Sequence, residues 1–359
     1  MRMLLAGGGT GGHLFPAVAL AERLMLEESD AEVLFVGTER GIEARVLPEL
    51  GWPLKTVDIK GFSGKGFLAK IEVMVKLIKS IKQGVAILKQ FTPDIVVGVG
   101  GYASAPMVIA ARLKGVPIVL HEQNAIPGLT NRMLGRWAKK VCVSFDQTRN
   151  AFANAEVTGN PLRGELEKCP ETETENMTLL VFGGSRGARA INEAVCDALV
   201  NLKDWHGKLQ IIHQTGEEDF ARVEMKYSEA GWKNSEITPF INDMASVYRK
   251  ASLIVCRAGA TTIAELTACG RPAILIPFPH AANDHQRANA EALAVKGAAL
   301  MMDQKDVDGV KLAAVISGLL KAPEELKSMG RVARSLGKKG AAEQILTICR
   351  QITSQEKAA

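Results

Sequence analysis

The chain has 359 residues, 47% of them hydrophobic, and a net charge of +5, which fits two globular domains with substantial cores. The small charge and the 5% aromatic content argue against nucleic-acid binding. Six scattered cysteines without a Cys-x-x-Cys pair predict neither a disulfide framework nor a zinc site. No stretch has the length and apolarity of a secretory signal or a membrane span, so we expect a cytosolic protein.

The first expected elements are an apolar strand, a glycine turn and a helix. Leu4–Ala6 lead into five glycines within Gly7–Gly12, and apolar residues then recur at helical spacing over Ala17–Leu24. Such a turn directs backbone N–H groups and the positive end of the helix dipole at one point, which favours an anion. Two alternatives remain: tight strand–helix packing alone, or a dinucleotide site, for which Glu39 only loosely supplies the expected acid.

The pattern of short apolar runs and helical stretches then continues and repeats. Runs at 31–37, 94–100, 116–122 and 140–145 are typical of parallel strands covered on both faces. A near copy begins at Leu179, where an apolar run leads into Gly183–Ala188, followed by runs at 209–216, 235–241, 251–259 and 271–278. The sequence therefore predicts an α/β protein with two doubly wound, Rossmann-like domains. We place them at 1–160 and 161–337, with a last helix, about 338–359, joining the first domain.

Residues 256–290 carry a dense set of polar groups. A strand is followed by a small-residue turn and by a helix that begins at about Thr261. Glu265, in the early turns of this helix, suits the vicinal diol of a ribose, and the amides of Gln286 and Asn289 suit sugar hydroxyls because amides both donate and accept. An acid that only complements the helix dipole is the alternative for Glu265.

Six motifs follow one another along the chain: GGTGGH (8–13), GGYASAP (100–106), HEQN (121–124), GNPLR (159–163), GGSRGA (183–188) and RAGATTIAE…HQRANA (257–290). In this order and spacing the chain resembles the MurG family of bacterial glycosyltransferases, glycosyltransferase family 28. The resemblance implies the GT-B fold, in which two Rossmann-like domains face a central cleft, and an inverting, metal-independent transfer without a cofactor. It implies that N-acetylglucosamine moves from UDP-N-acetylglucosamine to lipid I, undecaprenyl-pyrophosphoryl-MurNAc-pentapeptide, giving lipid II for peptidoglycan.

The resemblance also implies which residues contact the substrates. Ser185 and Arg163 are implied for the diphosphate, Glu265 for the ribose, and Gln286 with Asn289 for the N-acetylglucosamine. The backbone around Ile241 is implied to read the uracil edge. From the first domain, Thr10 to Gly12 and Asn124 are implied to complete the donor site. The full implied set for UDP-N-acetylglucosamine is Thr10, Gly11, Gly12, Asn124, Arg163, Ser185, Ile241 (uracil), Ala260, Thr261, Thr262, Glu265, Gln286 and Asn289, and that for the acceptor is Gly101 and Tyr102.

Displacing UDP from the anomeric carbon requires a base for the acceptor hydroxyl and stabilisation of the charge that grows on the diphosphate. A neutral histidine suits the first task, so His13 is the leading candidate for the base and Glu122 is the second. A role of His13 in capping its helix or hydrogen-bonding the acceptor remains the alternative. Asp306 and Asp308 formally match a metal-binding Asp-x-Asp pair, but acids at a helix start are usually caps, so we expect no metal ligands.

The segment 60–90 carries seven lysines and the single acid Glu72. Apolar residues at 71, 74, 75 and 78 and lysines at 70, 76, 79 and 82 predict an amphipathic helix that can lie on an anionic bilayer. A core-facing helix with a solvated lysine face is the alternative. A lipid-linked acceptor favours the first, and with it peripheral attachment to the cytoplasmic face of the inner membrane. Other cell-wall or division proteins are further partners that the resemblance implies.

Competing functions make different demands on the chain. A UDP-N-acetylglucosamine 2-epimerase would share the donor half of the site but act on the donor itself, without an acceptor loop such as GGYASAP. A non-catalytic sugar-nucleotide-binding subunit would not need both halves in one chain, and a dehydrogenase would need a nicotinamide pocket. The sequence therefore favours the transferase.

Overall fold

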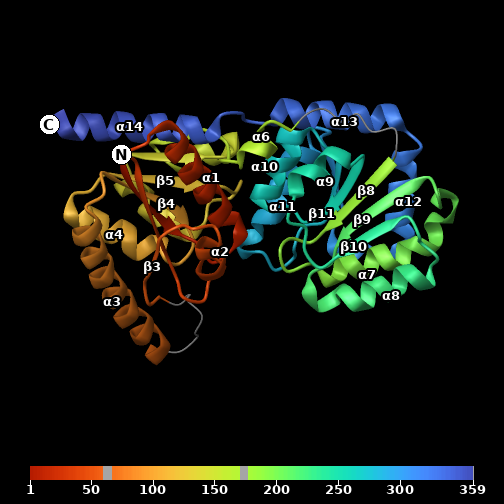
Figure 1. The fold of residues 1–359 in the computed structure, drawn as a ribbon, viewed down its shortest axis with the longest axis horizontal. Helices are drawn as coiled ribbons and strands as arrows, with labels where there is room; N and C mark the ends of the chain where they lie inside the picture. Colours follow the sequence, from red (N-terminus) through yellow and green to blue (C-terminus); the bar gives the residue numbers. More distant parts are fainter. Residues whose placement is uncertain (60–66, 170–176, 359) are drawn as a thin grey trace. The chain divides into compact units, whose positions relative to one another are not determined.

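The structure is a computed structural model that describes residues 1–59, 67–169 and 177–358. It divides into two compact units, here called unit 1 (residues 1–163 and 340–359) and unit 2 (residues 164–339) (Figure 1). The C-terminal helix therefore belongs to the same unit as the N-terminal strand. Residues 161–163, which the sequence assigns to the second domain, belong to unit 1, and residues 338 and 339, which it assigns to the last helix of the first domain, belong to unit 2.

Unit 1 is built on a seven-stranded parallel sheet in the order β3-β2-β1-β4-β5-β6-β7. Its strands are β1 (Arg2–Gly7), β2 (Glu32–Gly37), β3 (Leu54–Thr56), β4 (Ile95–Gly100), β5 (Ile118–Glu122), β6 (Lys140–Val143) and β7 (Ala155–Val157). Its α-helices are α1 (Gly11–Glu27), α2 (Glu43–Glu49), α3 (Phe67–Phe91), α4 (Ser104–Lys114), α5 (Leu129–Leu134) and α14 (Ala341–Ala358).

Helices cover both faces of this sheet, because successive strand residues point to opposite sides. Met3 and Leu5 of β1 lie in one core with apolar residues of α1, α2 and α14. Leu4 and Ala6 lie in the other core, with residues of α3, α4 and α5. The two ends of the chain meet in the first core, where α14 packs beside α1 (Figure 1).

Unit 2 contains a six-stranded parallel sheet in the order β10-β9-β8-β11-β12-β13. Its strands are β8 (Met177–Phe182), β9 (Leu209–Gln214), β10 (Ser235–Thr238), β11 (Leu253–Cys256), β12 (Ala273–Leu275) and β13 (Ala299–Met301). Its α-helices are α6 (Gly164–Glu167), α7 (Arg189–Ala198), α8 (Phe220–Glu229), α9 (Met244–Lys250), α10 (Ala260–Cys269), α11 (His285–Ala294), α12 (Gly309–Leu320) and α13 (Pro323–Leu336). One face of the sheet packs on α7, α8 and α12, and α9 to α11 lie on the other (Figure 1).

The ten strands expected from apolar runs are all present, and the doubly wound α/β prediction is confirmed. Three strands were not predicted: β3, β7 and β13, each of three residues and each at the edge of a sheet. Runs this short carry no usable periodicity. All six cysteines are free and buried, and in the described part of the chain no helix is long and apolar enough to cross a membrane.

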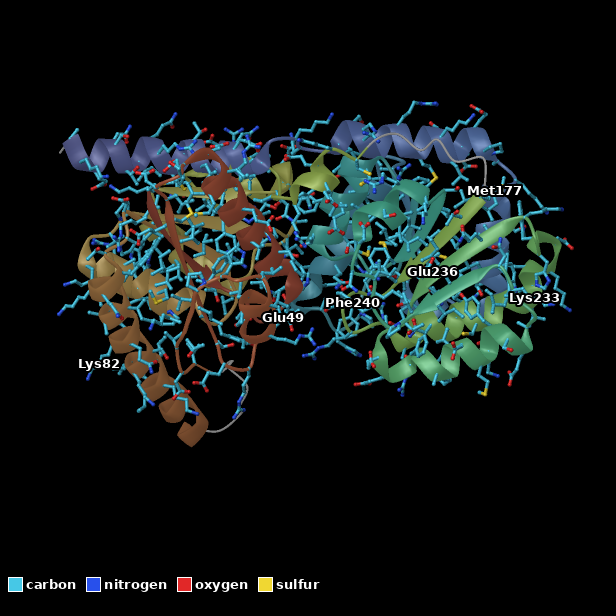
Figure 2. The ribbon with its side chains drawn as sticks, in the orientation of Figure 1. Glu49, Lys82, Met177, Lys233, Glu236 and Phe240 are labelled. Carbon is cyan, nitrogen blue, oxygen red and sulfur yellow. The ribbon has the colours of Figure 1, made fainter. Side chains whose placement is uncertain are left out.

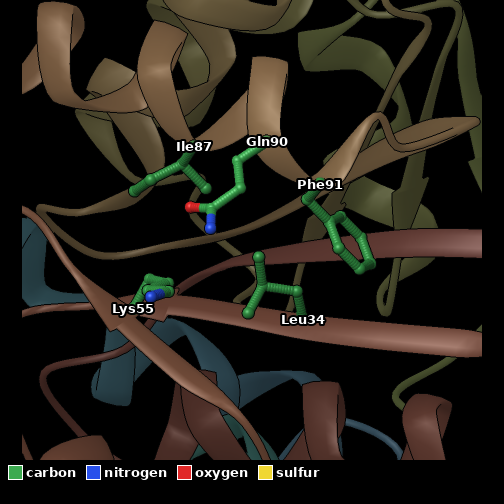
Figure 3. A pocket seen from close by; sticks show the side chains of 5 residues that line it. All are labelled: Leu34, Lys55, Ile87, Gln90 and Phe91. Carbon is green, nitrogen blue, oxygen red and sulfur yellow. The ribbon is translucent and has the colours of Figure 1, made fainter.

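Unit 1 has a pocket on the face of the sheet that α3 covers. It is lined by Leu34 of β2, Lys55 of β3, and Ile87, Gln90 and Phe91 of α3 (Figure 3). None of these is a candidate site residue, and the lining is mainly apolar. We assign no function to this pocket.

Candidate active site

Each sheet reverses its strand order beside its first strand, between β1 and β4 in unit 1 and between β8 and β11 in unit 2. In doubly wound sheets, ligands bind outside the carboxyl ends of the strands at this reversal. His13 follows β1 and Tyr102 follows β4, and Ser185 follows β8 and Ala260 follows β11. Each unit therefore places candidate residues at its own reversal point.

The first glycine turn holds a carboxylate of the protein itself. Glu43, at the start of α2, is completely buried and its Oε2 accepts a hydrogen bond of 2.7 Å from the Gly9 amide. Its Oε1 accepts from the backbone N–H and the hydroxyl of Thr38, at 2.8 and 2.9 Å. A Cβ on Gly8 would lie 2.5 Å from this carboxyl, so the glycine is needed for space. The buried charge argues against a pyrophosphate at Gly9, and Glu39, the acid considered for a dinucleotide site, is exposed.

The turn also packs directly against the loop that follows β4. The Gly8 amide donates to the Gly100 carbonyl at 3.3 Å, and Gly101, with a φ of +80°, lies against the Gly8 backbone. A Cβ on Gly100 would come within 3.0 Å of the His13 ring. The glycines at 100 and 101 thus leave room for the first turn and for the His13 imidazole, while the Tyr102 side chain beside them is exposed.

His13 is half-buried and hydrogen-bonds to a chain of polar groups behind it. Its Nδ1 lies 3.1 Å from Oε1 of Gln123, whose Nε2 is 2.9 Å from the Val99 carbonyl and 3.0 Å from Nδ1 of His121. Nε2 of His121 lies 3.1 Å from the Gly159 carbonyl. Burial lowers the pKa of His121 to about 4, so this imidazole is neutral near pH 7.

Glu122, the second candidate for the base, is buried and its carboxylate accepts four hydrogen bonds. Oε1 accepts from the backbone and side-chain nitrogens of Asn124, at 3.0 and 3.3 Å. Oε2 accepts from the Gly128 amide at 3.0 Å and from Nδ2 of Asn131 at 2.9 Å. A carboxylate with all of these partners holds the loop after β5 in place, and both of its oxygens already accept hydrogen bonds within unit 1.

The other candidate residues of unit 1 lie near the same edge. Thr10 precedes α1 without a side-chain cap, and Gly11 and Gly12 form the first turn of that helix. Asn124 is held against Glu122, as described above. Arg163 is exposed, and its Nε lies 3.7 Å from Oε1 of Glu22 on α1, a distance typical of a loose ion pair. The structure thus places Arg163 with the first glycine helix, in unit 1.

In unit 2, Ser185 lies exposed in the second glycine turn. The Gly187 amide closes this turn on the Gly184 carbonyl at 2.9 Å, and α7 begins directly after it, without a side-chain cap. The uncapped N-terminus of a helix beside a hydroxyl is suited to a phosphate. This arrangement fits the diphosphate contact expected for Ser185.

One buried amide ties this turn to the segment expected to read uracil. Nε2 of Gln214, at the end of β9, donates to the Gly184 carbonyl at 2.9 Å. Its Oε1 accepts from the backbone N–H of Ile241 at 2.8 Å. The Ile241 N–H is therefore already bonded within unit 2, so only the carbonyl of Ile241 remains for a hydrogen bond to a ligand. Phe240 beside it is exposed (Figure 2).

Glu265 lies on α10, half-buried, and Oε2 accepts a hydrogen bond of 2.9 Å from the hydroxyl of Tyr248 on α9. Burial raises the pKa of Glu265 to about 7, and the Tyr248 hydrogen bond only partly opposes this shift. The helix begins at Ala260, with Thr261 and Thr262 in its first turn and no side-chain cap at Gly259. A carboxyl whose pKa is raised to about 7 marks a candidate functional site.

The two amides expected on the sugar have different surroundings. Asn289 of α11 is buried and donates to the Ala258 carbonyl at 3.1 Å, so it supports the turn before α10. Gln286 is half-buried, and its Oε1 accepts from the Phe278 amide at 2.9 Å. Both side chains therefore organise the backbone around α10 and β12.

Asp308, considered as a metal ligand, caps α12 instead. Its Oδ1 accepts from the Lys311 amide at 2.7 Å, and Oδ2 lies 3.3 Å from the ammonium of Lys311. Asp306 belongs to a short 3₁₀-helix, Gln304–Asp306, just before it. Within the described residues, no group of three or more His, Cys, Asp or Glu side chains could hold a metal ion.

Several residues of the site were not singled out from the sequence: Glu43, His121, Gln123, Gln214 and Tyr248. His121 and Gln123 belong to the HEQN motif, and the two-residue spacing of an extended chain places them on one side and Glu122 on the other. That spacing was a usable signal. No sequence signal pointed to Glu43, because it lies beyond the position at which a dinucleotide site has its acidic residue.

Comparison with known proteins identifies the family. The model described as "Glycosyltransferase family 28 N-terminal domain" matches residues 3–143, and "Glycosyltransferase family 28 C-terminal domain" matches residues 178–345. The chain belongs to glycosyltransferase family 28. A relative from Syntrophotalea carbinolica, named UDP-N-acetylglucosamine--N-acetylmuramyl-(pentapeptide) pyrophosphoryl-undecaprenol N-acetylglucosamine transferase, is 57% identical over 358 residues, which are 99% of this chain and 100% of the relative.

Solved structures agree with the family 28 assignment. The crystal structure of Acinetobacter baumannii MurG has a TM-score of 0.80 and 33% identity, covering 98% of this chain and 99% of that one. A UDP-GlcNAc 2-epimerase from Neisseria meningitidis has a TM-score of 0.66 at 13% identity, covering 97% of this chain and 99% of that one, a likeness of fold alone. The resemblance read from the six motifs and the GT-B fold class are confirmed, and this family 28 chain is a glycosyltransferase.

Proposed function

We propose that this chain transfers N-acetylglucosamine from UDP-N-acetylglucosamine to the muramyl sugar of undecaprenyl-pyrophosphoryl-MurNAc-pentapeptide, with inversion at the anomeric carbon. The observation that carries the proposal is the 57% identity over essentially the whole length of a relative that is named for this transfer. The arrangement of each unit supports it, because polar candidates lie where doubly wound sheets bind ligands.

Unit 2 binds the donor. The N-terminus of α7 and the Ser185 hydroxyl face the diphosphate, the Glu265 carboxylate accepts from a ribose hydroxyl, and the Ile241 carbonyl accepts from the uracil N3–H. Support comes from the uncapped N-termini of α7 and α10 and from the exposure of Ser185. Gln286 and Asn289 hold the backbone that surrounds the sugar, and the amide nitrogen of Gln286 donates to it.

Unit 1 binds the acceptor and supplies the base. Nε2 of His13 removes the proton of the attacking hydroxyl, the bond from that oxygen to the anomeric carbon forms, and the bond to the UDP oxygen breaks. His13 is preferred to Glu122 because the Glu122 carboxylate already accepts four hydrogen bonds. The loop at Gly101 and Tyr102, packed against the first glycine turn, contacts the acceptor.

The transfer needs no metal. The charge that grows on the leaving diphosphate is stabilised by the dipole and the N–H groups of α7 and by the guanidinium of Arg163. Asp308, the acid with the most suitable sequence pattern for a metal, is used as a helix cap with Lys311.

Unit 1 attaches peripherally to the anionic cytoplasmic face of the inner membrane through α3. The apolar side chains of Met74, Val75 and Ile78 are 56%, 59% and 50% exposed. Lys79 and Lys82 on the same helix are also exposed, and Figure 2 shows Lys82. These exposures support the membrane-facing interpretation over the core-facing one, since a core helix would bury all three apolar residues. Ile71 and Lys70 lie outside the residues whose side chains are described.

The test is transfer of radiolabelled N-acetylglucosamine from its UDP donor to a lipid I analogue by the purified chain, with and without EDTA. We expect transfer that EDTA does not reduce, that His13→Ala nearly abolishes, and that a control at the exposed His206, His206→Ala, retains. Absence of transfer despite binding of UDP would contradict the proposed acceptor. Loss of transfer with EDTA, restored by Mg²⁺, would contradict the metal-independent chemistry.

A further inference from the structure

We propose that Gln123 and His121 are positioning residues that hold His13 as the tautomer with a proton on Nδ1 and a bare Nε2. This inference rests on the proposed function, in which Nε2 of His13 accepts the proton of the attacking hydroxyl. The three side chains form one hydrogen-bonded chain that runs from the edge of unit 1 into its interior.

The buried end of the chain fixes the first proton. The Gly159 carbonyl oxygen can only accept, so Nε2 of His121, 3.1 Å away, carries the hydrogen. The His121 ring is buried, and burial lowers its pKa to about 4, so near pH 7 it holds only this one proton. Nδ1 of His121 is therefore a bare acceptor.

The bare Nδ1 of His121 fixes the orientation of the Gln123 amide. Its amide nitrogen has two hydrogens and two acceptors in reach, the Val99 carbonyl at 2.9 Å and the bare Nδ1 of His121 at 3.0 Å. The flipped amide would set its oxygen against the Val99 carbonyl oxygen and against a lone pair of His121, with no hydrogen between them. The amide oxygen of Gln123 must therefore face His13.

His13 then has no choice of tautomer while it is neutral. Oε1 of Gln123 can only accept, so Nδ1 of His13, 3.1 Å away, donates, and Nε2 keeps its lone pair. No hydrogen-bond partner of Nε2 is present among the described residues. Gly100 contributes by leaving space, since a Cβ there would meet the ring at 3.0 Å. The logic matches that of catalytic triads, where a third group fixes the histidine tautomer, but here an uncharged amide does so.

A purely structural role of Gln123, tying the ends of β4 and β5 to α1, is the competing explanation. The two explanations differ in what they predict for the His13 proton. If the role of Gln123 is purely structural, replacing it lowers stability but leaves the His13 tautomer unchanged. If Gln123 positions His13, replacing it changes the tautomer and the rate of the chemical step together.

The experiment uses the full chain with ¹⁵N-labelled histidine, observed by long-range ¹H–¹⁵N spectra at about pH 8.5, where an ordinary imidazole is neutral. His13→Asn identifies the His13 signals. In the unsubstituted chain we expect His13 protonated on Nδ1. In Gln123→Met, which keeps the volume and removes the amide, we expect a mixture of tautomers. We expect kcat to fall about 10- to 100-fold with the donor KM nearly unchanged, while Gln90→Met, at an exposed position of α3, changes neither.

Each outcome decides between the explanations. A His13 ring protonated on Nε2 in the unsubstituted chain overturns the proposal, even if Gln123→Met fails to fold. An unchanged tautomer and unchanged kcat in folded Gln123→Met also overturn it. If His13→Ala retains its kcat, the proposed base is wrong, whereas the tautomer measurement still reports separately on the positioning by Gln123.

Discussion

The carboxylate of Glu43 accepts a hydrogen bond of 2.7 Å from the backbone amide of Gly9. The first glycine turn therefore encloses an anion that belongs to the protein, in the place where a dinucleotide-binding turn receives a pyrophosphate. The same carboxylate binds Thr38 at the end of β2. Glu43 thus joins the loops after two neighbouring strands and fixes the turn from which the helix of His13 starts.

Glu43→Gln should weaken this turn. The amide nitrogen of glutamine would face either the Gly9 or the Thr38 amide, a donor against a donor, and leave one of them unpaired in a buried site. We expect a loss of about 1–3 kcal/mol in the free energy of unfolding and a lower kcat, measured by chemical denaturation and by the transfer assay. Glu49→Gln, at an exposed position of the same helix (Figure 2), is the matched control and should change neither. Equal behaviour of the two variants would show that the carboxylate has no such role.

The sequence predicted the architecture well because its main signal is local. Near-continuous apolar runs and glycine turns mark most of the strands and both reversal points, and each run has a strand. What it missed, β3, β7 and β13, depends on pairing at a sheet edge, which a run of three residues does not encode.

From the sequence, only the site residues expected to contact a ligand could be predicted, and the residues that support them could not. Ser185, Glu265 and His13 follow strands or begin helices, where chain position alone suggests a function. The supporting groups Gln123 and Gln214 act through contacts with residues distant in sequence, Gln123 with His13 and Gln214 with Ile241. Such pairings follow from strand order in space, which the motifs do not specify.

Glu265 should make unit 2 less stable as the pH rises. Burial raises its folded pKa to about 7, above the ordinary 4.5, so between these values the folded chain binds a proton that the unfolded chain has lost. Its contribution to stability is therefore fully present below pH 4.5 and is lost as the pH rises through about 7. Glu265→Gln removes this dependence. As the pH rises from about 5 to 8, we expect the free energy of unfolding of the variant to increase by about 1–3 kcal/mol relative to that of the unsubstituted chain.

Thermal unfolding of both chains across that range tests this prediction. The exposed Glu236→Gln (Figure 2) serves as the control and should follow the unsubstituted chain. A constant difference between Glu265→Gln and the unsubstituted chain at all pH values would contradict the raised pKa. Above about pH 7, where the Glu265 carboxyl is mainly ionised, the same variant should also bind UDP about tenfold more weakly, because it exchanges a charged acceptor for a neutral one.

Gln214→Leu should weaken donor binding more than catalysis. The substitution removes the link between the Gly184 carbonyl and the Ile241 amide, so the phosphate turn and the base-reading segment are no longer held in one geometry. We expect the donor KM to rise about tenfold, with kcat reduced less, and the free energy of unfolding to fall by about 1–3 kcal/mol. Gln210→Leu, on the same strand, is the control. A fall in kcat at unchanged KM would assign Gln214 to another role.

The exposed apolar side chains of α3 should determine membrane binding. Val75→Glu places a charge at a site that is 59% exposed, so folding should be little affected, whereas insertion into a bilayer would require burying that charge. Loss of one buried valine is worth about 1.5–3 kcal/mol, so we expect at least a tenfold weaker association with vesicles that contain phosphatidylglycerol, measured by sedimentation. Val310→Glu, 66% exposed on α12 of unit 2, is the matched control and should bind like the unsubstituted chain.

The lysines make a separate contribution that salt can reveal. Replacing Lys82, exposed on the same helix (Figure 2), by Gln should weaken binding to anionic vesicles by about 1 kcal/mol and reduce its salt dependence, because the lost attraction is screened within a Debye length. Val75→Glu should weaken binding at high salt as well, since apolar burial is not screened. Binding to neutral phosphatidylcholine vesicles as strong as to anionic ones would contradict the role of the lysines. Binding unaffected by Val75→Glu would place the membrane contact elsewhere on the chain.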